Sequence, residues 1–474
     1  MPPVGETRSA PAATSTWLDR LRDPDGTTPN LPYLDGIRAF AVLMILLRHA
    51  WGLSGAPPLG FTLPLLGEVR LTPLMVMFSS GVDLFFVLSG FLLARSYLRA
   101  DFLSRPPPNL WRYYAQRIVR IGPPYWITLL LVLFLFTPSL IPAERVYSKP
   151  GLLMFLVHLV FGQTAFLPAF GWYHIETPFW TLTIEMMFYL ALPLMVRAFL
   201  RRRWVVSVPL TLALVLGWLY CCRYGFQGLV QLVRDYSLFG FGEDVTRFFL
   251  SHTFPAHLLH FALGITLCNL VVRRELGWRS SPAFQAATGP RAGLLYLAAG
   301  VALTFYWFHR HGQASLTHGW AFPLNYMNAE TAASREYYFL EEIPFAISYG
   351  LILFGASLAP EWVRRVLSLP ALCFFGVVGY SVYLWHMPIL YQLNSLPWMA
   401  ALTDPSRHFW ALLAAGTLVT VLVSTGFFIA VERPVTALAK RLGRSPAPRA
   451  SEAPASPAAP EAASVPVQAL SKEG

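Results

Sequence analysis

Long runs of apolar residues separated by short polar segments make up most of the chain between residues 36 and 431. A helix that crosses a bilayer needs about 20 consecutive, mostly apolar residues. Ten runs meet this length and predict membrane-spanning helices. Their approximate ranges are 36–54, 79–97, 121–138, 177–199, 204–222, 254–273, 291–308, 341–358, 370–391 and 409–431. The pattern therefore predicts an all-α fold, a polytopic transmembrane helix bundle with short loops.

The apolar segment 151–170 is not counted as an eleventh span. It contains His158 and Gln163 and ends near Pro168. Lys and Arg concentrate in loops that face the cytosol, and ten spans with a cytosolic N-terminus place the main basic clusters on that side. These clusters are Arg201-Arg202-Arg203, Arg273-Arg274, Arg364-Arg365 and Lys440-Arg441. We therefore expect 151–170 to be an amphipathic or re-entrant segment on the outer face, with both termini cytosolic.

Composition supports one membrane domain. The chain is 55% hydrophobic and only 13% charged, whereas soluble domains are nearer a quarter charged. The cytosolic basic loops explain the net charge of +11, so we expect no nucleic-acid partner. We divide the chain into a cytosolic N-terminal segment 1–32, a transmembrane domain 33–436 and a disordered Ala- and Pro-rich tail 445–474. The outer loops 223–253 and 309–340 either shape an acceptor site or cap the bundle.

Ionisable residues within spans usually face a protein interior or a water-filled cavity. Four such residues, on four different spans, share a layer roughly 6–12 Å below the outer boundary. They are His49, Asp83, Glu185 and His386. A carboxylate at the same depth as an imidazole can fix its tautomer, so we predict that Asp83 orients His49. The shared layer predicts a single cavity.

The inner side carries a different set of charges. Arg38 precedes His49 by eleven residues on the same helix face, a rise of ~16 Å. Arg117 and Arg120 are i,i+3 neighbours before the third predicted span, where a helix N-terminus would also attract anions. With Arg95, Arg99 and Arg112 nearby, they predict a cytosolic phosphate-binding mouth. Membrane-edge anchoring of single arginines is the open alternative.

Three further residues are candidates without a settled role. Ser89 precedes Gly90, where small residues permit close helix packing, and packing is the simpler interpretation of Ser89. Tyr383 lies one turn before His386. Arg48 is adjacent to His49, and because neighbouring helical residues point about 100° apart, Arg48 can pair with a carboxylate such as Glu185.

Six segments in order resemble the acyltransferase-3 family of polytopic membrane acyltransferases, over about Tyr33 to Pro434. They are YLDGIRAFAVLMILLRHA, GVDLFFVLSGFLL, RIVRIGPPYW, FWTLTIEMMFYLALP, GYSVYLWHMP and VERP. The resemblance implies that His49 is the catalytic histidine, with Arg38 as its motif partner. It also implies that acyl-CoA binds at Arg117 and Arg120 in a bacterial inner membrane.

We therefore expect an O-acyltransferase that moves an acyl group, acetyl in the first instance, from cytosolic acyl-CoA to a hydroxyl of a sugar-containing acceptor such as a surface polysaccharide. His49 acts as a general base or through an acyl-histidine, with Asp83 and Glu185 as the acidic groups. We expect no permanently bound cofactor and no metal site. The alternatives are a secondary transporter, a member of the other membrane O-acyltransferase class and a non-enzymatic assembly protein.

Overall fold

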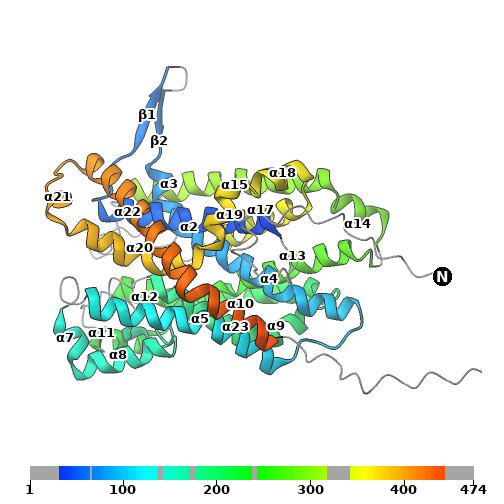
Figure 1. The fold of residues 1–474 in the computed structure, drawn as a ribbon. Helices are drawn as coiled ribbons and strands as arrows, with labels where there is room; N and C mark the ends of the chain where they lie inside the picture. The colour runs from blue at the N-terminus through cyan, green and yellow to red at the C-terminus, as the bar shows by residue number, and fades with distance from the viewer. Residues whose placement is uncertain are drawn as a thin grey trace, which may run out of the picture.

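The computed structural model describes residues 31–64, 67–136, 142–169, 178–236, 243–278, 280–317 and 342–443. Almost all regular structure in this part is helical, as Figure 1 shows. The segment before residue 31, the tail 445–474 and most of the predicted outer loop 309–340 lie outside the described residues.

Eight helical segments are long and apolar enough to cross a membrane, and two bent pairs raise this number to as many as ten. The eight are α2 (Pro32–Leu53); α3 (Thr72–Met77), η1 (Phe78–Ser80) and α4 (Gly81–Phe102) together; α5 (Leu110–Leu131) with η2 (Val132–Phe136); α9 (Trp180–Phe199); α10 (Trp204–Tyr224); η5 (Phe254–His257) with α13 (Leu258–Glu275); α15 (Pro290–Thr317); and α22 (Pro405–Phe427), η7 (Phe428–Glu432) and α23 (Arg433–Gly443) together.

The two bent pairs follow one another in the chain. Helix α17 (Glu342–Leu358) meets α18 (Glu361–Leu367) at 119°, and α19 (Pro370–Val377) meets α20 (Gly379–Asn394) at 72°. Pro360 has extended backbone at the first break, and Val378 (φ −85°, ψ 2°) separates the two helices at the second. Each predicted span overlaps one of these ten segments, and the predicted fold class is confirmed.

Shorter elements fill the connections. Helix α8 is too short to cross a bilayer, which agrees with the prediction that 151–170 is not a membrane span. The predicted outer loop 223–253 contains two amphipathic helices, α11 and α12. The short helices are α7 (Ala143–Tyr147), α8 (Lys149–Leu159), η3 (Leu167–Ala169), α11 (Gln227–Tyr236), α12 (Glu243–Ser251), α14 (Pro282–Ala287) and α21 (Pro397–Ala400).

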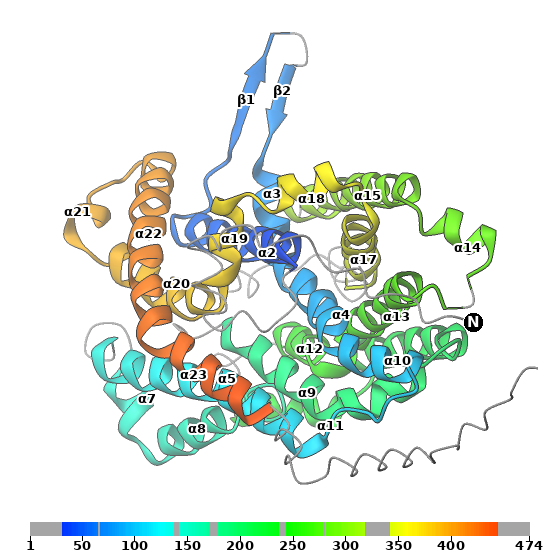
Figure 2. The ribbon, with the colours of Figure 1, turned by 45° about the vertical axis from the view of Figure 1, so that its right-hand side comes forward.

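A β-hairpin that we did not predict projects from the bundle beside α3 (Figure 2). Its strands β1 (Gly60–Leu63) and β2 (Gly67–Arg70) pair antiparallel, with Gly60 opposite Arg70. Strands of four residues carry too little period-2 pattern to be recognised from sequence alone.

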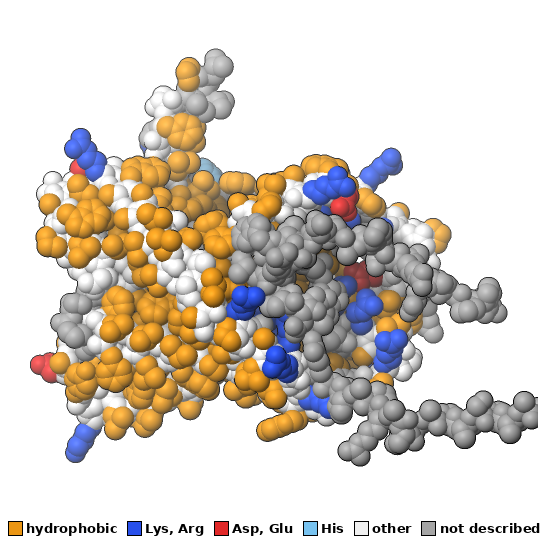
Figure 3. Space-filling model, in the orientation of Figure 1, with side chains coloured by type: hydrophobic (Ala, Val, Ile, Leu, Met, Phe, Trp, Pro, Cys, Tyr) orange, Lys and Arg blue, Asp and Glu red, His pale blue; other side chains and the backbone are white. Residues whose placement is uncertain are grey.

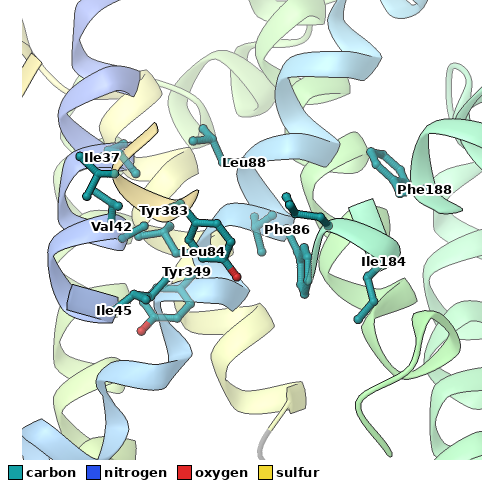
Figure 4. Packing of buried hydrophobic residues seen from close by; sticks show 14 of the residues in the cluster. Ile37, Val42, Ile45, Leu84, Phe86, Leu88, Ile184, Phe188, Tyr349 and Tyr383 are labelled. Atoms are coloured by element: carbon teal, nitrogen blue, oxygen red, sulfur yellow. The ribbon is translucent and has the colours of Figure 1, made fainter. Parts of the chain in front are cut away.

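Close helix crossings position the interior. Helix α4 packs along α13, and a Cβ added to Gly264 would lie 2.2 Å from the Val87 carbonyl oxygen. A Cβ on Gly90 would likewise lie 2.5 Å from the Phe261 carbonyl oxygen, which confirms the close approach expected at Gly90. Figure 4 shows the apolar packing of α2, α4, α9, α17 and α20 around this crossing.

The outer surface matches a lipid environment. Figure 3 shows a broad apolar band, with Lys and Arg gathered mainly toward one end of the molecule. Large exposed apolar side chains lie on the spans themselves, including Leu194, Val206 and Leu422. Soluble proteins rarely expose contiguous apolar surface of this extent. The chain is therefore a multi-pass membrane protein.

Candidate active site

A cavity of about 140 Å³ lies between α2, α4, α5, α9 and α20. Its lining residues on α4 run from Val82 to Leu93, which corresponds to a length of ~16 Å. Most of the wall is apolar, and the polar side chains gather at particular levels. They are Arg38, Ser89, Arg117, Arg120, Thr181, Glu185, Tyr189, Tyr380 and Tyr383.

Three arginines make one end of the cavity basic. Arg117 and Arg120 lie one turn apart on α5, and Arg38 reaches the cavity from α2. The Arg117 guanidinium faces the rings of Tyr113 and Tyr189 at 5.8 and 5.9 Å. Its Nε is buried and has no hydrogen-bond partner among the described residues. This end is therefore suited to bind an anion.

One part of the predicted mouth is wrong. Helix α5 begins at Leu110, where Asn109 accepts a hydrogen bond from the backbone N–H of Arg112. Arg117 and Arg120 thus lie well inside the helix, and their guanidinium groups rather than a helix N-terminus supply the positive charge. The sequence pattern hid the true start because the first turns of α5 are polar and charged.

Arg95 and Arg99 are also placed differently from the prediction. Both pair with Glu275 of α13, at 2.8 and 3.4 Å respectively, and neither lines the cavity. Arg38 keeps its place at the basic end, where its Nη1 lies 3.0 Å from Asp35 Oδ1. The basic end is therefore formed by Arg38, Arg117 and Arg120.

Glu185 lies on the cavity wall together with two hydroxyl donors. Its Oε1 accepts hydrogen bonds from Ser89 Oγ at 3.2 Å and from the Tyr189 hydroxyl at 2.5 Å. Ser89 therefore contributes a polar contact in addition to its place in the α4 packing. Arg48, for which we expected a carboxylate partner such as Glu185, places its guanidinium 5.2 Å from the Trp51 ring centroid.

Tyr383 lines the other end of the cavity. Its hydroxyl lies 2.5 Å from Thr181 Oγ1 and donates to the Pro178 carbonyl oxygen. The Tyr383 ring is 5.6 Å from the ring of His386, on the next turn of α20. The cavity thus ends one side chain away from His386, at the level of the membrane farthest from the arginines.

His49 and His386 form a direct pair in the bundle interior. His49 Nδ1 lies 2.9 Å from His386 Nε2, and the two rings stack at 5.0 Å. The prediction that Asp83 orients His49 is wrong in its partner, because Asp83 lies against His260 at 3.1 Å. A predicted depth does not determine which helix faces which.

Hydrogen bonds assign the tautomers of the two histidines. His386 Nδ1 lies 2.7 Å from the Tyr383 carbonyl oxygen, which can only accept, so Nδ1 carries the proton. Neutral His386 then presents the Nε2 lone pair, and His49 Nδ1 must donate to it. The lone pair of His49 is therefore on Nε2. This is the same orienting role that a carboxylate performs for histidine in a catalytic triad.

Sequence reasoning missed a second polar cluster. Asp83 lies with His257, His260 and Glu342, and one ligand atom from each residue lies within 4.8 Å of the others. The signal for this cluster in the sequence was the spacing of His257 and His260 in the segment HLLH, at the predicted depth of Asp83. Glu342 lies far away in the sequence and gave none.

Buried Glu432, in the VERP segment, was also not among the predicted site residues. Its Oε2 accepts a hydrogen bond from Ser381 Oγ at 2.6 Å. It lies near Arg38, behind the basic end of the cavity.

Comparisons with known proteins identify the family of the chain. A family model described as an acyltransferase domain matches residues 31–429. Nodulation protein 10 of Rhizobium leguminosarum bv. viciae is 24% identical over 396 residues, covering 79% of this chain and 85% of that protein. No solved structure matches the chain.

Two other relatives are similar over most of this chain. The peptidoglycan O-acetyltransferase OatA of Listeria monocytogenes is 23% identical over 426 residues, which cover 85% of this chain and 56% of that protein. The regulator of hypoxia-inducible factor 1 of Caenorhabditis elegans is 25% identical over 438 residues, covering 87% of this chain and 82% of that protein. The chain belongs to the acyltransferase-3 family and is a membrane O-acyltransferase.

Proposed function

We propose that the protein transfers an acetyl or short acyl group from cytosolic acyl-CoA to a hydroxyl of a sugar-containing acceptor, such as a surface polysaccharide. The observation that carries this proposal is the cavity itself. It is basic at the end formed by Arg38, Arg117 and Arg120, and it runs toward Tyr383, next to the His49–His386 pair.

The charge and the length of the cavity support acyl-CoA as the donor. Guanidinium groups bind phosphates through charge-assisted hydrogen bonds, and the three arginines would hold the phosphorylated head of the donor. The apolar wall along α4 would accommodate the pantetheine arm over ~16 Å. Glu185 and Ser89, about midway along that wall, would contact its amide groups.

The chemistry requires a base next to the thioester. In the direct route, the acceptor hydroxyl attacks the thioester carbonyl carbon while His49 Nε2 takes its proton. The carbon–sulfur bond breaks, and the imidazolium returns the proton to the CoA thiolate. In the relay route, His49 Nε2 first displaces CoA and forms an acyl-histidine, which the acceptor then attacks. Both routes need the tautomer that His386 imposes on His49.

The acceptor and the compartment rest on weaker similarity. The name of the Listeria relative specifies acetyl transfer to peptidoglycan, which favours a glycan acceptor here. This chain spans only about half of the Listeria protein, 56% of its length, so the acceptor of that whole protein is not transferred directly. The basic clusters favour a bacterial inner membrane with the arginine end of the cavity and both termini in the cytosol.

The test uses the full chain reconstituted in vesicles with labelled acetyl-CoA on the arginine side and peptidoglycan fragments on the other. Wild-type protein should move label onto the glycan. His49→Ala should lower the rate by about 10²- to 10⁴-fold, the usual contribution of general-base catalysis. His408→Ala is the matched control, because His408 contacts Asn394 and lies outside the cavity.

Label transfer by His49→Ala at the wild-type rate would contradict the role of His49. An acyl adduct trapped on His49 in the absence of acceptor would select the relay route. If acetyl-CoA is consumed only with a polysaccharide fragment other than peptidoglycan, the acceptor changes and the donor site stands.

A further inference from the structure

The second polar cluster, Asp83, His257, His260 and Glu342, joins three helices at the end of the bundle farthest from the arginines. Asp83 is in the first turn of α4, His257 ends η5, His260 is in the first turn of α13 and Glu342 begins α17. His260 Nε2 lies 3.1 Å from Asp83 Oδ1, and His257 Nδ1 lies 3.1 Å from Glu342 Oε2. The crossed distances are 4.0 Å for His257 and Asp83 and 3.8 Å for His260 and Glu342.

All four side chains are buried. His260 has no exposed surface, and His257, Glu342 and Asp83 expose 1%, 4% and 7%. Helix dipoles favour negative charge on carboxyl groups in the first turn of a helix, and two carboxyl groups that lie close together in a buried site favour a cation between them. The rings of Phe86 and Trp180 pack against His257.

The histidine nitrogens are close to the carboxylates without making hydrogen bonds to them. Both ring nitrogens of His257 and of His260, and Oε2 of Glu342, are buried with no hydrogen-bond partner among the described residues. Buried polar groups in native proteins are nearly always paired. One ligand atom from each of the four residues lies within 4.8 Å of the other three, a spacing suited to ligands around a shared centre.

We propose that Asp83, His257, His260 and Glu342 bind one divalent transition metal ion of the zinc class, which clamps α4, α13 and α17 together. Zinc takes imidazole nitrogen and carboxylate oxygen ligands at about 2.0–2.2 Å in a tetrahedron, so its ligand atoms lie ~3.3–3.5 Å apart. The four contacts above, 3.1–4.0 Å, bracket that separation. Two nitrogen and two oxygen ligands suit zinc better than calcium or magnesium, which prefer oxygen alone.

The site is structural, since four protein ligands close a tetrahedral zinc sphere and leave no position for substrate. Its position lets it influence the acyl-transfer cavity. Phe86 packs on the His257 ring at 4.8 Å and also lines the cavity, and Val82 flanks Asp83 on the same wall. A metal that fixes α4 against α13 would therefore fix this wall. The metal site itself does not depend on the proposed acyl donor or acceptor.

His252 has a supporting position behind one ligand. Its Nε2 lies 3.7 Å from Glu342 Oε1, the oxygen on the side away from His257. Groups that hold a metal ligand from behind typically change metal affinity by about 10- to 100-fold. His252→Ala should therefore weaken zinc binding by about that factor and keep the stoichiometry.

The test measures metal on the purified full chain in detergent. After chelation and reloading with zinc alone, wild-type protein should retain about one equivalent per chain through gel filtration, and zinc should raise its unfolding temperature. The double variant His257→Ala/His260→Ala should lose both effects. His158→Ala is the control, because His158 is buried elsewhere and its Nδ1 contacts the Met154 carbonyl oxygen.

A second variant keeps the test decisive if the double variant fails to fold. His260→Cys loaded with cobalt should gain a thiolate-to-cobalt absorption band that wild-type protein lacks. The four native cysteines are present in both proteins and therefore cannot cause the difference. Equal zinc retention by wild type and the double variant, or absence of the band in folded His260→Cys, would overturn the proposal. Wild-type protein that binds no zinc and shows no thermal shift would overturn it as well.

Discussion

The contact between His49 and His386 makes a quantitative prediction for His386→Leu. Leucine removes the acceptor at 2.9 Å from His49 Nδ1 in this part-buried pair. An unsatisfied buried donor costs about 1–3 kcal/mol, and each 1.36 kcal/mol is a factor of ten in rate. If this cost destabilises the reactive tautomer of His49, kcat should fall by about 10- to 100-fold.

The assay is release of CoA from acetyl-CoA by the reconstituted protein, with peptidoglycan fragments as acceptor. KM for acetyl-CoA should stay near the wild-type value, because the substitution leaves the arginines of the proposed donor site, Arg38, Arg117 and Arg120, unchanged. His386→Gln should keep most of the activity, since the glutamine side-chain oxygen can accept the same hydrogen bond. If His386→Gln is active and His386→Leu is not, His386 acts by orienting His49 and not only by packing against it.

The double variant His49→Ala/His386→Leu provides the sharpest check. If His386 acts only through His49, the double variant should be no slower than His49→Ala alone, because residues that act as a unit are not additive. Two independent losses that multiply would refute the orienting role. Wild-type kcat in folded His386→Leu would refute it more directly.

Three other predictions follow from the cavity and the helix packing. Arg117→Ala should raise KM for acetyl-CoA about 10- to 100-fold with little change in kcat, because it removes a charged hydrogen bond worth ~1.5–3 kcal/mol. The control Arg95→Ala breaks an exposed pair with Glu275 and should leave KM unchanged. Equal effects of the two variants on KM would reject the assigned donor site. Glu185→Gln should leave the zinc content of the protein unchanged while altering acetyl transfer, measured on one sample. Gly264→Leu should lower the unfolding temperature strongly, because its Cβ would meet the Val87 carbonyl oxygen at 2.2 Å. A melting curve like that of wild type would show that α4 and α13 separate more easily than their packing implies.

The sequence was most informative where the physics is local. Each span was visible because bilayer thickness requires a continuous apolar run, and this requirement does not depend on neighbouring helices. The main boundary error, the start of α5 at Leu110, arose where the first turns leave the apolar pattern and carry Arg112 and Arg117. The hairpin Gly60–Arg70 was missed because its strands are short.

The sequence also identified most side chains of the site. Arg38, Arg117, Arg120, Ser89, Glu185 and Tyr383 all line one cavity. They could be found because charged or polar groups in apolar spans are costly and stand out from their surroundings. Their common cavity is a finding of the structure, since sequence gives the depth of a residue but not the direction in which its helix faces.

Pairings were decided by the tertiary structure alone. The sequence predicts a similar depth for His49, Asp83 and His386, yet His49 contacts His386, and Asp83 contacts His260. Which of these contacts forms depends on the order of the helices in the bundle and on the rotation of each about its axis. Both are set by side-chain packing between distant segments, such as the Gly90 and Gly264 crossing of α4 with α13. A single sequence fixes what enters the membrane and how deep it lies, whereas packing between helices decides which groups can react or share a metal.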